Sequence, residues 1–347
     1  MALAKIAFIG RKQGTSHKDA SSFRGGFTLE RARKGEEIGL SQSGLEKVDD
    51  FAQADCSFIR INPEQVNSRA LTRITRAEEE AKRYSCVLNS IDGFLYQSNK
   101  TECYKVWKKN SVRCPEFIEF SPWQNKHTII EQALHFIGSF GGVYVRTNNE
   151  DSGKGIYFFD KGASSKEISQ AIFRLRLRSL TNRVSNSKIL LMESINNQDN
   201  QGIYHVYRAH VVGQTVIGGY AIVGQSPVIH SRDVKASLWD SFVKYNGRLK
   251  GILSDDEQRA MIIRAFQSTK TDVGAIEFFC IKGQLIFLEV NPTWGGKHHF
   301  GGKGDSSLMD KIQRNKDLPE LSLVNRWLAA EAYYQTLYQT IKTEFVK

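Results

Sequence analysis

Residues 274–296, GAIEFFCIKGQLIFLEVNPTWGG, carry the most informative pattern of the chain. Two apolar runs, residues 275–281 and 285–290, flank the pair Lys282-Gly283, which is typical of a tight hairpin turn. The sharp exit Asn-Pro-Thr-Trp-Gly-Gly follows the second run at once. The pattern predicts two antiparallel strands joined by a short turn.

Polar side chains interrupt both apolar runs. Glu277 lies in the first run, and Glu289 and Asn291 lie in the second, where residues two apart face the same side of a strand. Hairpin pairing can bring Glu277 beside them, and such a set of oxygen donors suits Mg²⁺ held together with phosphates. The alternative is a few solvated acids on the open face of a sheet. The apolar neighbours Leu288 and Val290 favour the metal site.

Length and composition bound the class of protein. A chain of 347 residues predicts two or three domains or subdomains, and contents of 40% hydrophobic and 24% charged residues are typical of a soluble globular protein. No apolar run approaches the roughly 20 residues that span a bilayer. Residues 1–10 are interpreted as a first β-strand rather than a signal peptide. No membrane association is expected.

The five cysteines are scattered and form no CxxC pair, which predicts reduced thiols in a cytoplasmic protein. The net charge of +11 is compatible with nucleic acid, an acidic peptide or small anions as partners. The densest basic clusters, residues 105–109 and 174–178, have helical spacing, and no nucleic-acid-binding motif accompanies them. Nucleic acid is therefore an unlikely partner.

Residues 1–97 predict a small α/β domain in which strands alternate with helices. Its expected elements are a strand at 4–10, a loop at 11–26, a helix-like segment before the strand CSFIRI, a helix at 69–84 and a strand at 86–89.

Residues 98–194 predict a second unit around a strand–loop–strand pattern. Its expected elements are helices at 101–110, 128–140 and 164–181 and strands at 143–147, 156–159 and 188–195. The second helix is expected to begin with a capping box of Thr128 and Glu131 and to place Ile130, Leu134 and Ile137 on one apolar face.

In the loop at 148–155, Ser152, Gly153, Lys154 and Gly155 can present N–H groups and an ammonium to phosphate oxygens. The alternative is an ordinary flexible hairpin loop.

Residues 195–347 form the third predicted unit. A hairpin is expected at 203–212 and 215–223, with the Arg208 guanidinium facing a cleft, and residues 225–253 look irregular. Helices are expected at 254–269 and 321–345, on either side of the opening hairpin.

This order of elements and residues resembles the ATP-grasp superfamily, and within it the ribosomal-protein glutamate ligase and lysine-biosynthesis type of carboxylate–amine ligase. The resemblance covers about residues 52–296. Its segments are ADCSFIRI with Arg60, VLNS followed by Asn99-Lys100, HVYRAHVVGQTV with Arg208, and GAIE…LEVNP. The last is the most specific, because Glu277 and Glu289 are twelve residues apart, as the acids of that family are.

The resemblance implies an α/β (α+β) fold with an N-terminal α/β domain, a central lid subdomain and a C-terminal antiparallel subdomain that carries a metal site. It implies ATP and Mg²⁺ (or Mn²⁺) as cofactors, with Lys100 and Arg146 on the phosphates. The loop from Ser152 to Gly155 is expected to close over them. The backbone of Glu193, Ser194 and Ile195 is expected to meet adenine.

The remaining implied roles concern the metal and the substrate. Glu277, Glu289 and Asn291 are expected to hold the metal ion. Arg208 is expected to stabilise the migrating phosphoryl group, and Arg60 to receive a substrate carboxylate. The resemblance and the expected terminal helix also favour a homodimer.

Four departures from the family pattern stand out. Arg146-Thr147 replaces a lysine followed by proline, and Glu277 replaces an aspartate; both replacements keep the charge. Val206 replaces the acid two residues before Arg208. The final loop also differs from the usual Ser/Thr-Pro-Gly, and these last two departures indicate a different substrate.

That final loop supplies the candidate substrate residues Trp294, Lys297, His298 and His299. The two histidines can contact substrate or act as a base for the amine. Alternatively, they are surface histidines on a mobile loop.

The function expected from these features is an ATP-dependent ligase that joins a carboxylate to an amine through an acylphosphate, acting on an amino acid or a small peptide. Two alternatives remain open. One is a ligase that cross-links a ribosomally made peptide, and the other is a non-catalytic binding protein with the same scaffold.

Overall fold

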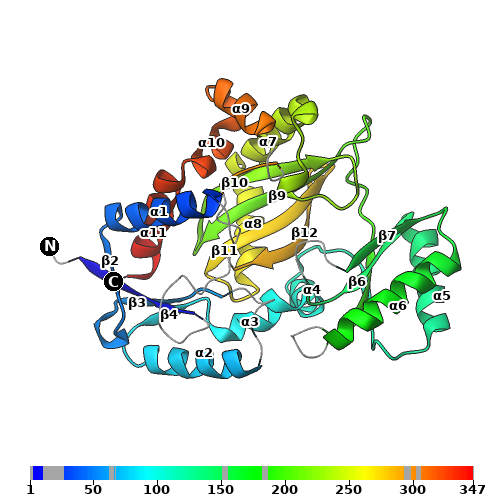
Figure 1. The fold of residues 1–347 in the computed structure, drawn as a ribbon, viewed down its shortest axis with the longest axis horizontal. Coiled ribbons are helices and arrows are strands. Elements are labelled where there is room, and N and C mark those ends of the chain that lie inside the picture. The colour runs from blue at the N-terminus through cyan, green and yellow to red at the C-terminus, as the bar shows by residue number, and fades with distance from the viewer. Residues whose placement is uncertain are drawn as a thin grey trace.

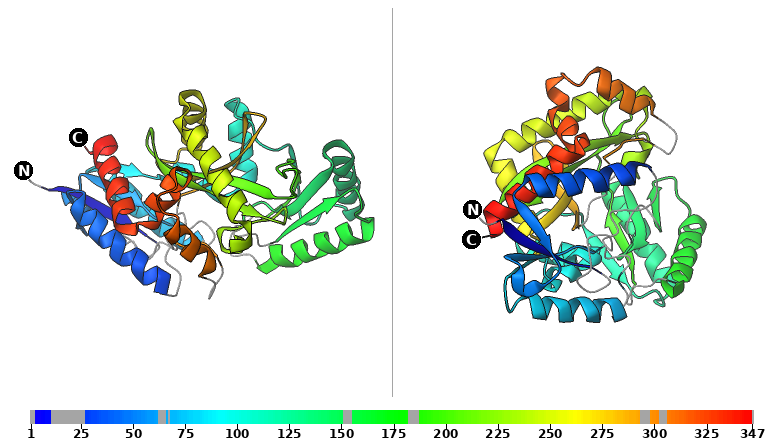
Figure 2. Two further views of the ribbon diagram at one scale, coloured as in Figure 1. Left: turned by 90° about the horizontal axis from the view of Figure 1, so that it is seen from above. Right: turned by 60° about the vertical axis from the view of Figure 1, so that its left-hand side comes forward.

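The computed structural model describes residues 3–10, 27–61, 66, 68–150, 155–181, 187–292, 298–301 and 306–346, which form three four-stranded sheets. Figure 1 shows both ends of the chain at one end of the molecule and helices α5 and α6 at the other. Seen from above in Figure 2, the C-terminal sheet lies between the N-terminal domain and the central subdomain. Among the described residues, no helix is both long and apolar enough to cross a membrane.

The N-terminal domain has a parallel sheet with strand order β2-β1-β3-β4, as expected for an α/β domain. Its elements are β1 (Ala4–Ile9), α1 (Phe27–Gln42), β2 (Leu45–Val48), a 3₁₀ turn (Phe51–Gln53), β3 (Cys56–Ile59), α2 (Ser68–Ala81), β4 (Cys86–Leu88) and α3 (Ile91–Ser98). The expectation of a helix-like segment before CSFIRI is wrong, because the chain there forms β2 and a short 3₁₀ turn. The short edge strand β2 buries only Leu45, so its polar middle does not show strand alternation.

Helix α1 packs closely on α11 (Ala330–Phe345), which comes from the far end of the chain. Gly35 and Gly39 make this approach possible, because a Cβ added at Gly35 would lie 2.7 Å from Ala330 Cβ. One added at Gly39 would lie 2.6 Å from the backbone N of Gln335. The two glycines therefore tie the N-terminal domain to the last helix of the chain.

We expect Gly39→Ala to lower the free energy of unfolding by about 1–2 kcal/mol. Overpacking against the α11 backbone costs about 1–3 kcal/mol, of which the better helix propensity of alanine offsets up to about 1 kcal/mol. Gly138→Ala is the matched control, since Gly138 also lies within a helix but nothing lies within 4 Å of an added Cβ. That variant should gain about 0.5–1 kcal/mol. Urea unfolding of both variants measures the difference, and a shift of the same sign in both would contradict this packing.

The central subdomain has an antiparallel sheet with strand order β5-β8-β6-β7. Its elements are α4 (Lys100–Lys109), β5 (Phe117–Phe120), α5 (Lys126–Phe140), β6 (Gly142–Thr147), β7 (Ile156–Asp160), α6 (Ser165–Thr181) and β8 (Ile189–Glu193). Helices α5 and α6 cover the face that carries Val143, Val145 and Leu191. The opposite face carries Tyr144, Arg146 and Met192, and Tyr104 of α4 donates a hydrogen bond to Met192 Sδ at 3.0 Å.

Two details of the central helices differ from expectation. The side chain of Asn125 caps α5, three residues before the expected cap at Thr128, because its Oδ1 accepts from His127 N at 2.9 Å. Leu134 was expected to face inward, but it is exposed, and Ile129, Ala133 and Phe136 fill the core instead.

The C-terminal subdomain has an antiparallel sheet with strand order β10-β9-β11-β12. Its elements are β9 (Tyr204–Val212), β10 (Thr215–Gly224), α7 (Trp239–Ser254), α8 (Asp256–Gln267), β11 (Val273–Ile281), β12 (Gln284–Asn291), α9 (Ser307–Arg314), α10 (Ser322–Leu328) and α11, with 3₁₀ turns at Ser231–Asp233, Ala236–Leu238 and Pro319–Leu321. Both expected hairpins are confirmed. Helix α7 fills half of the segment that looked irregular, and a break at Ala329 divides the expected terminal helix.

His205 of β9 is buried beneath α7 and stacks on Tyr245 with ring centroids 4.0 Å apart. Both of its ring nitrogens lack a hydrogen-bond partner within the described ranges. Burial, helped by the charge of Arg248 and opposed by Asp199, lowers the pKa of His205 to about 4. The ring is therefore neutral in the folded protein, whereas it takes a proton in the unfolded chain below about pH 6.5.

We expect His205→Phe to flatten the dependence of stability on pH. Because the folded-state pKa lies below the unfolded one, the stability contribution is fully present above about pH 6.5 and is lost toward pH 4, at up to about 1.4 kcal/mol per pH unit. Phenylalanine keeps the stacking and removes the titrating group. Urea unfolding between pH 4.5 and 7 compares the two proteins, and parallel curves would count against a buried neutral His205.

Candidate active site

One row of polar side chains crosses all four strands of the C-terminal sheet. Each of the four residues is the direct register partner of the next, in the order Tyr220 on β10, Arg208 on β9, Glu277 on β11 and Glu289 on β12. Directly opposite residues of antiparallel strands point to the same face. The row therefore places a cation and two carboxylates side by side.

A β-bulge brings the two carboxylates together. The hairpin pairs Ile281 with Gln284 and Phe278 with Phe287, so uninterrupted pairing would set Glu277 opposite Leu288. The register shifts between Glu277 and Phe278, and Glu277 faces Glu289 instead. An extra residue in one strand moves every later side chain to the other face. The bulge is thus the reason that both acids share one face.

The central subdomain places two cations against these acids. Asn99 caps α4 through hydrogen bonds from Thr101 N at 3.0 Å and Glu102 N at 3.4 Å, which fixes Lys100 in the first turn. Lys100 Nζ lies 3.1 Å from Glu289 Oε2. Arg146, on β6, is also buried nearby. Although burial alone would raise it, the charges of Lys100 and Arg146 lower the pKa of Glu289 to about 2.

Arg208 forms the other half of the row. It makes an ion pair with Glu277, and its Nη1 donates to Tyr220 Oη at 3.2 Å. Burial raises the pKa of Glu277, an effect that Arg208 opposes and the charge of Glu289 reinforces. Arg208 Nε is buried and has no hydrogen-bond partner among the residues described by the structure. One donor of Arg208 is therefore unsatisfied within the described chain.

Glu150 occupies the gap between the two cations. Its backbone oxygen accepts from Lys100 Nζ at 3.1 Å and from Arg146 Nη2 at 2.5 Å. Its carboxylate is held by Arg178 Nε at 3.0 Å and by Thr147 Oγ1 at 2.7 Å. The carbonyl oxygen of Glu150 thus lies where an oxyanion would contact both cations, and sequence reasoning missed this residue.

The oxygen donors of Glu277, Glu289 and Asn291 are too few to hold a metal ion without further ligands. In the described parts of the chain no group of three or more His, Cys, Asp or Glu side chains is placed to hold a metal. Two carboxylates are present, and Asn291 Nδ2 donates to Glu289 Oε1 at 3.1 Å, which leaves Asn291 Oδ1 for a cation. Mg²⁺ is commonly bound by one or two carboxylates plus substrate phosphates, so the residues fit Mg²⁺ that arrives with a phosphate ligand.

Comparisons with known proteins gave matches among solved structures. No family model and no curated protein matches the chain. The D-cycloserine synthetase DcsG matches 96% of this chain and 100% of its own, with 12% identity and a TM-score of 0.52. D-alanyl-alanine synthetase A from Vibrio cholerae matches 96% of this chain and 99% of its own, with 12% identity and a TM-score of 0.50. The ATP-grasp ligase PsnB, complexed with a minimal precursor, matches 85% of this chain and 92% of its own, with 11% identity and a TM-score of 0.50.

The chain has the ATP-grasp fold. The α/β (α+β) fold class expected from the motifs is therefore confirmed. Similarity at this level of identity concerns the fold alone, and the finer likeness to one ligase type stays a prediction, as do the domain bounds at 97 and 194.

Six of the residues expected in an ATP-grasp site lie together in the structure. They come from α4, β6, β9, β11 and β12 and are Lys100, Arg146, Arg208, Glu277, Glu289 and Asn291. Gly155 lies beside the carboxylate of Glu150, since a Cβ added there would meet Glu150 Oε2 at 2.6 Å. Ser152, Gly153, Lys154, Trp294 and Lys297 lie outside the described residues.

The segment expected to meet adenine lies at the end of β8. Glu193 N donates to Glu116 O at 2.8 Å, and Ser194 N donates to Gly142 O at 3.3 Å. Ile195 O accepts from Asn197 N at 2.9 Å. These backbone groups already have partners within the ATP-grasp scaffold, and their contact with a base stays a prediction.

Arg60 lies at a second location. It forms a buried ion pair with Glu36 of α1, and Tyr338 of α11 donates to Glu36 Oε1 at 2.5 Å. The adjoining cavity, which Pro292 also lines, measures about 20 Å³. That volume holds about one water molecule. A role for Arg60 toward a substrate carboxylate stays a prediction.

His298 is not a surface residue, and that alternative is wrong for it. Its ring is buried, its Nδ1 bonds the backbone oxygen of Trp327, and its centroid lies 5.4 Å from that of Tyr333. The aromatic residues of α10 and α11 that enclose it are distant in sequence, so the loop composition gives no sign of them. His299 is half-buried.

Proposed function

We propose that the protein is an ATP-dependent ligase that phosphorylates a substrate carboxylate and joins the resulting acylphosphate to an amine, releasing ADP and phosphate. The observation that carries the proposal is the charge row at the junction of two sheets. Lys100 meets Glu289 at 3.1 Å, Glu289 faces Glu277, and Glu277 pairs with Arg208. Two adjacent carboxylates with a cation on either side suit a polyphosphate together with a divalent cation.

The residues divide the chemistry among them. Lys100 and Arg146 hold phosphate oxygens in place of the Glu150 carbonyl, which they contact at 3.1 and 2.5 Å. A substrate carboxylate oxygen attacks the γ-phosphorus, and the bond to the β-phosphate oxygen breaks. Arg208, whose Nε has no partner in the described chain, stabilises the charge of the migrating group.

The second half of the reaction forms the amide. The amine nitrogen attacks the acyl carbon, the bond to phosphate breaks, and the nitrogen loses a proton as phosphate leaves. Glu277, Glu289 and Asn291 would hold Mg²⁺ or Mn²⁺, which supplies positive charge against the phosphates. Positioning and charge neutralisation carry this chemistry, and it needs no covalent help from the protein.

An amino acid or a peptide is the proposed substrate class. The similar structures include a D-alanyl-alanine synthetase and a ligase bound to a precursor, which supports this class without choosing within it. A peptide cross-linking ligase is the second candidate, favoured by the net charge of +11. We also propose that the ligase is cytoplasmic and forms a homodimer.

The test combines binding and turnover. The protein is titrated with Mg·ATP by calorimetry, and is then incubated with Mg·ATP, amino acids and peptides while ADP, phosphate and condensed products are followed by mass spectrometry. We expect heat of binding and a product lighter by one water than its two substrates. Binding without ADP release across the panel would favour a non-catalytic binding protein. No binding of Mg·ATP would refute both.

A further inference from the structure

The outer face of α6 exposes a stripe of apolar side chains. Phe173 is 61% exposed, Leu177 is 49% exposed and Leu180 is 65% exposed. Their spacing of four and three residues puts them on one side of the helix. Opposite them, Ile168, Ile172 and Leu175 fill the core against the central sheet. The helix is therefore apolar on two sides, only one of which the described protein covers.

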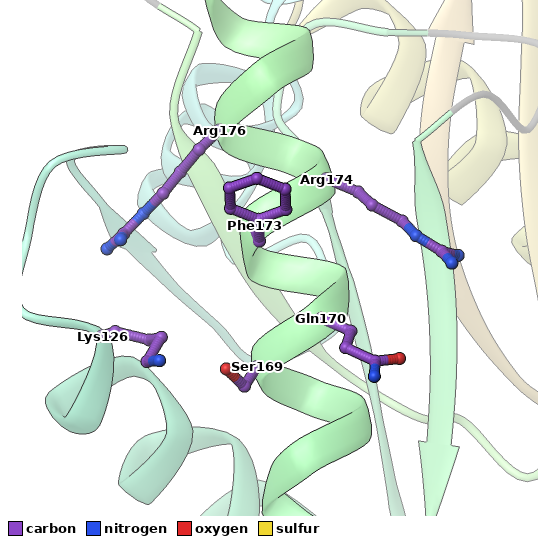
Figure 3. A pocket seen from close by; sticks show the side chains of 6 residues that line it. All are labelled: Lys126, Ser169, Gln170, Phe173, Arg174 and Arg176. Carbon is purple, nitrogen blue, oxygen red and sulfur yellow. The ribbon is translucent and has the colours of Figure 1, made fainter.

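An open groove of about 440 Å³ adjoins this stripe. It is lined by Lys126, Ser169, Gln170, Phe173, Arg174 and Arg176. Figure 3 shows Phe173 between Lys126 and Arg176 on one side and Gln170 and Arg174 on the other. The lining thus holds three cations, one aromatic ring and no carboxylate.

One of the three cations is held in place by the protein. Arg176 Nη2 donates to the backbone oxygen of Gln124 at 2.6 Å, while its Nε is buried with no hydrogen-bond partner in the described chain. Arg174 is exposed, and Lys126 is half-buried at the start of α5. Cations around an aromatic ring match carboxylates that approach with an apolar side chain.

We propose that this α6 face, defined by Lys126, Phe173, Arg174, Arg176, Leu177 and Leu180, docks an acidic amphipathic helical peptide. Apolar side chains of the peptide pack on the stripe, and its carboxylates pair with the three cations. From Ser169 to Leu180 the helix spans about 17 Å, so a partner of about three helical turns covers it. The central sheet separates this face from Arg146, and docking therefore leaves the nucleotide site accessible.

The charges select this partner over others. A second copy of the chain that docks this same face about a two-fold axis would set Arg174 and Lys126 against the same cations, which repel one another. The phosphodiester backbone of a nucleic acid offers no apolar groups to the stripe. A flat lipid surface would leave the groove unfilled. An acidic amphipathic peptide satisfies the stripe, the cations and the groove together.

The experiment uses the full chain and a panel of fluorescein-labelled 15-residue peptides. Each carries Leu or Phe at positions with spacing of four and three and Glu or Asp elsewhere, and each has a scrambled version and a version with Lys in place of the acids. Fluorescence anisotropy without nucleotide measures binding. We expect panel members to bind, to weaken at high salt, and to lose affinity when scrambled or made basic.

Variants locate the binding site. Arg174→Glu and the double variant Phe173→Ser/Leu177→Ser should each weaken binding by about tenfold or more, by analogy with interface hot spots. Arg69→Glu on α2 and Leu95→Ser on α3 are matched exposed controls and should change it less than about twofold. Because all these side chains are exposed, the variants should fold, as circular dichroism would verify.

Three results would overturn the proposal. The first is that none of the panel peptides binds in a way that the α6-face variants weaken. Another is binding to phosphatidylserine vesicles, lost in Phe173→Ser/Leu177→Ser, in place of peptide binding. The third is self-association of the chain in sedimentation that the same variant removes. The measurement needs no ATP, so its outcome is independent of the proposed ligase activity.

Discussion

Glu289→Gln is expected to reduce ATP-dependent turnover by about 1,000-fold or more, while the protein stays folded. Glutamine keeps the shape of the side chain but removes the charge that Lys100 meets at 3.1 Å and that a metal ion would require. Loss of several kcal/mol of charge stabilisation in the transition state corresponds to a rate effect of about this size. Release of ADP and phosphate with saturating substrates measures the effect.

Glu119→Gln is the matched control. Glu119 Oε1 also accepts from two lysines, at 3.2 Å from Lys105 Nζ and 3.0 Å from Lys188 Nζ, on the surface of the central subdomain. Ion pairs near the surface contribute up to about 1 kcal/mol, and these lie outside the row of charged residues, so turnover should stay within about twofold of the parent. Full activity of Glu289→Gln, or an equal loss of turnover in both variants, would contradict the assignment of Glu289 to the catalytic site.

Arg60→Met is expected to lower the free energy of unfolding by about 3–5 kcal/mol, because it removes a cation that pairs with the buried Glu36. The double variant Glu36→Leu/Arg60→Met should recover most of that loss, since it removes both charges. Urea unfolding of the parent, the single variant and the double variant measures the loss of stability and its recovery.

The same double variant separates two roles of Arg60. If the ion pair serves only to join α1 to β3, the stable double variant should keep the KM of the parent for its carboxylate substrate. If Arg60 receives that substrate, KM should rise at least about tenfold although stability is restored, because a charge-assisted hydrogen bond is lost. If Arg60→Met alone lowers the free energy of unfolding by less than about 1 kcal/mol, the buried ion pair with Glu36 does not stabilise the protein as proposed.

Sequence reasoning predicted the hairpin and its acids but not what aligns them. The turn at Lys282-Gly283 and the spacing of Glu277 and Glu289 are local features. The bulge that sets the two acids opposite each other depends on pairing between the strands. Without it Glu277 would face Leu288, and nothing in the local sequence indicates which of the two pairings forms. The composition of a strand specifies its faces, and its partners specify its register.

The residues that were missed act through groups or neighbours that sequence does not reveal. Glu150 contacts Lys100 and Arg146 through a backbone oxygen, which every residue carries. Tyr220 becomes a partner of Arg208 only because β9 and β10 align. Burial of His298 likewise comes from helices that follow it in the chain.

The glycine-mediated contact between α1 and α11 has a consequence for synthesis on the ribosome. Helix α1 leaves the ribosome early, yet the surface that accommodates Gly35 and Gly39 is made only after nearly all of the intervening chain. Until α11 arrives, the parallel sheet β2-β1-β3-β4 lacks that covering helix, and Glu36 lacks Tyr338. Such incomplete domains expose apolar surface and are prone to misassembly. We therefore expect the N-terminal domain to complete its packing only after α11 has left the ribosome.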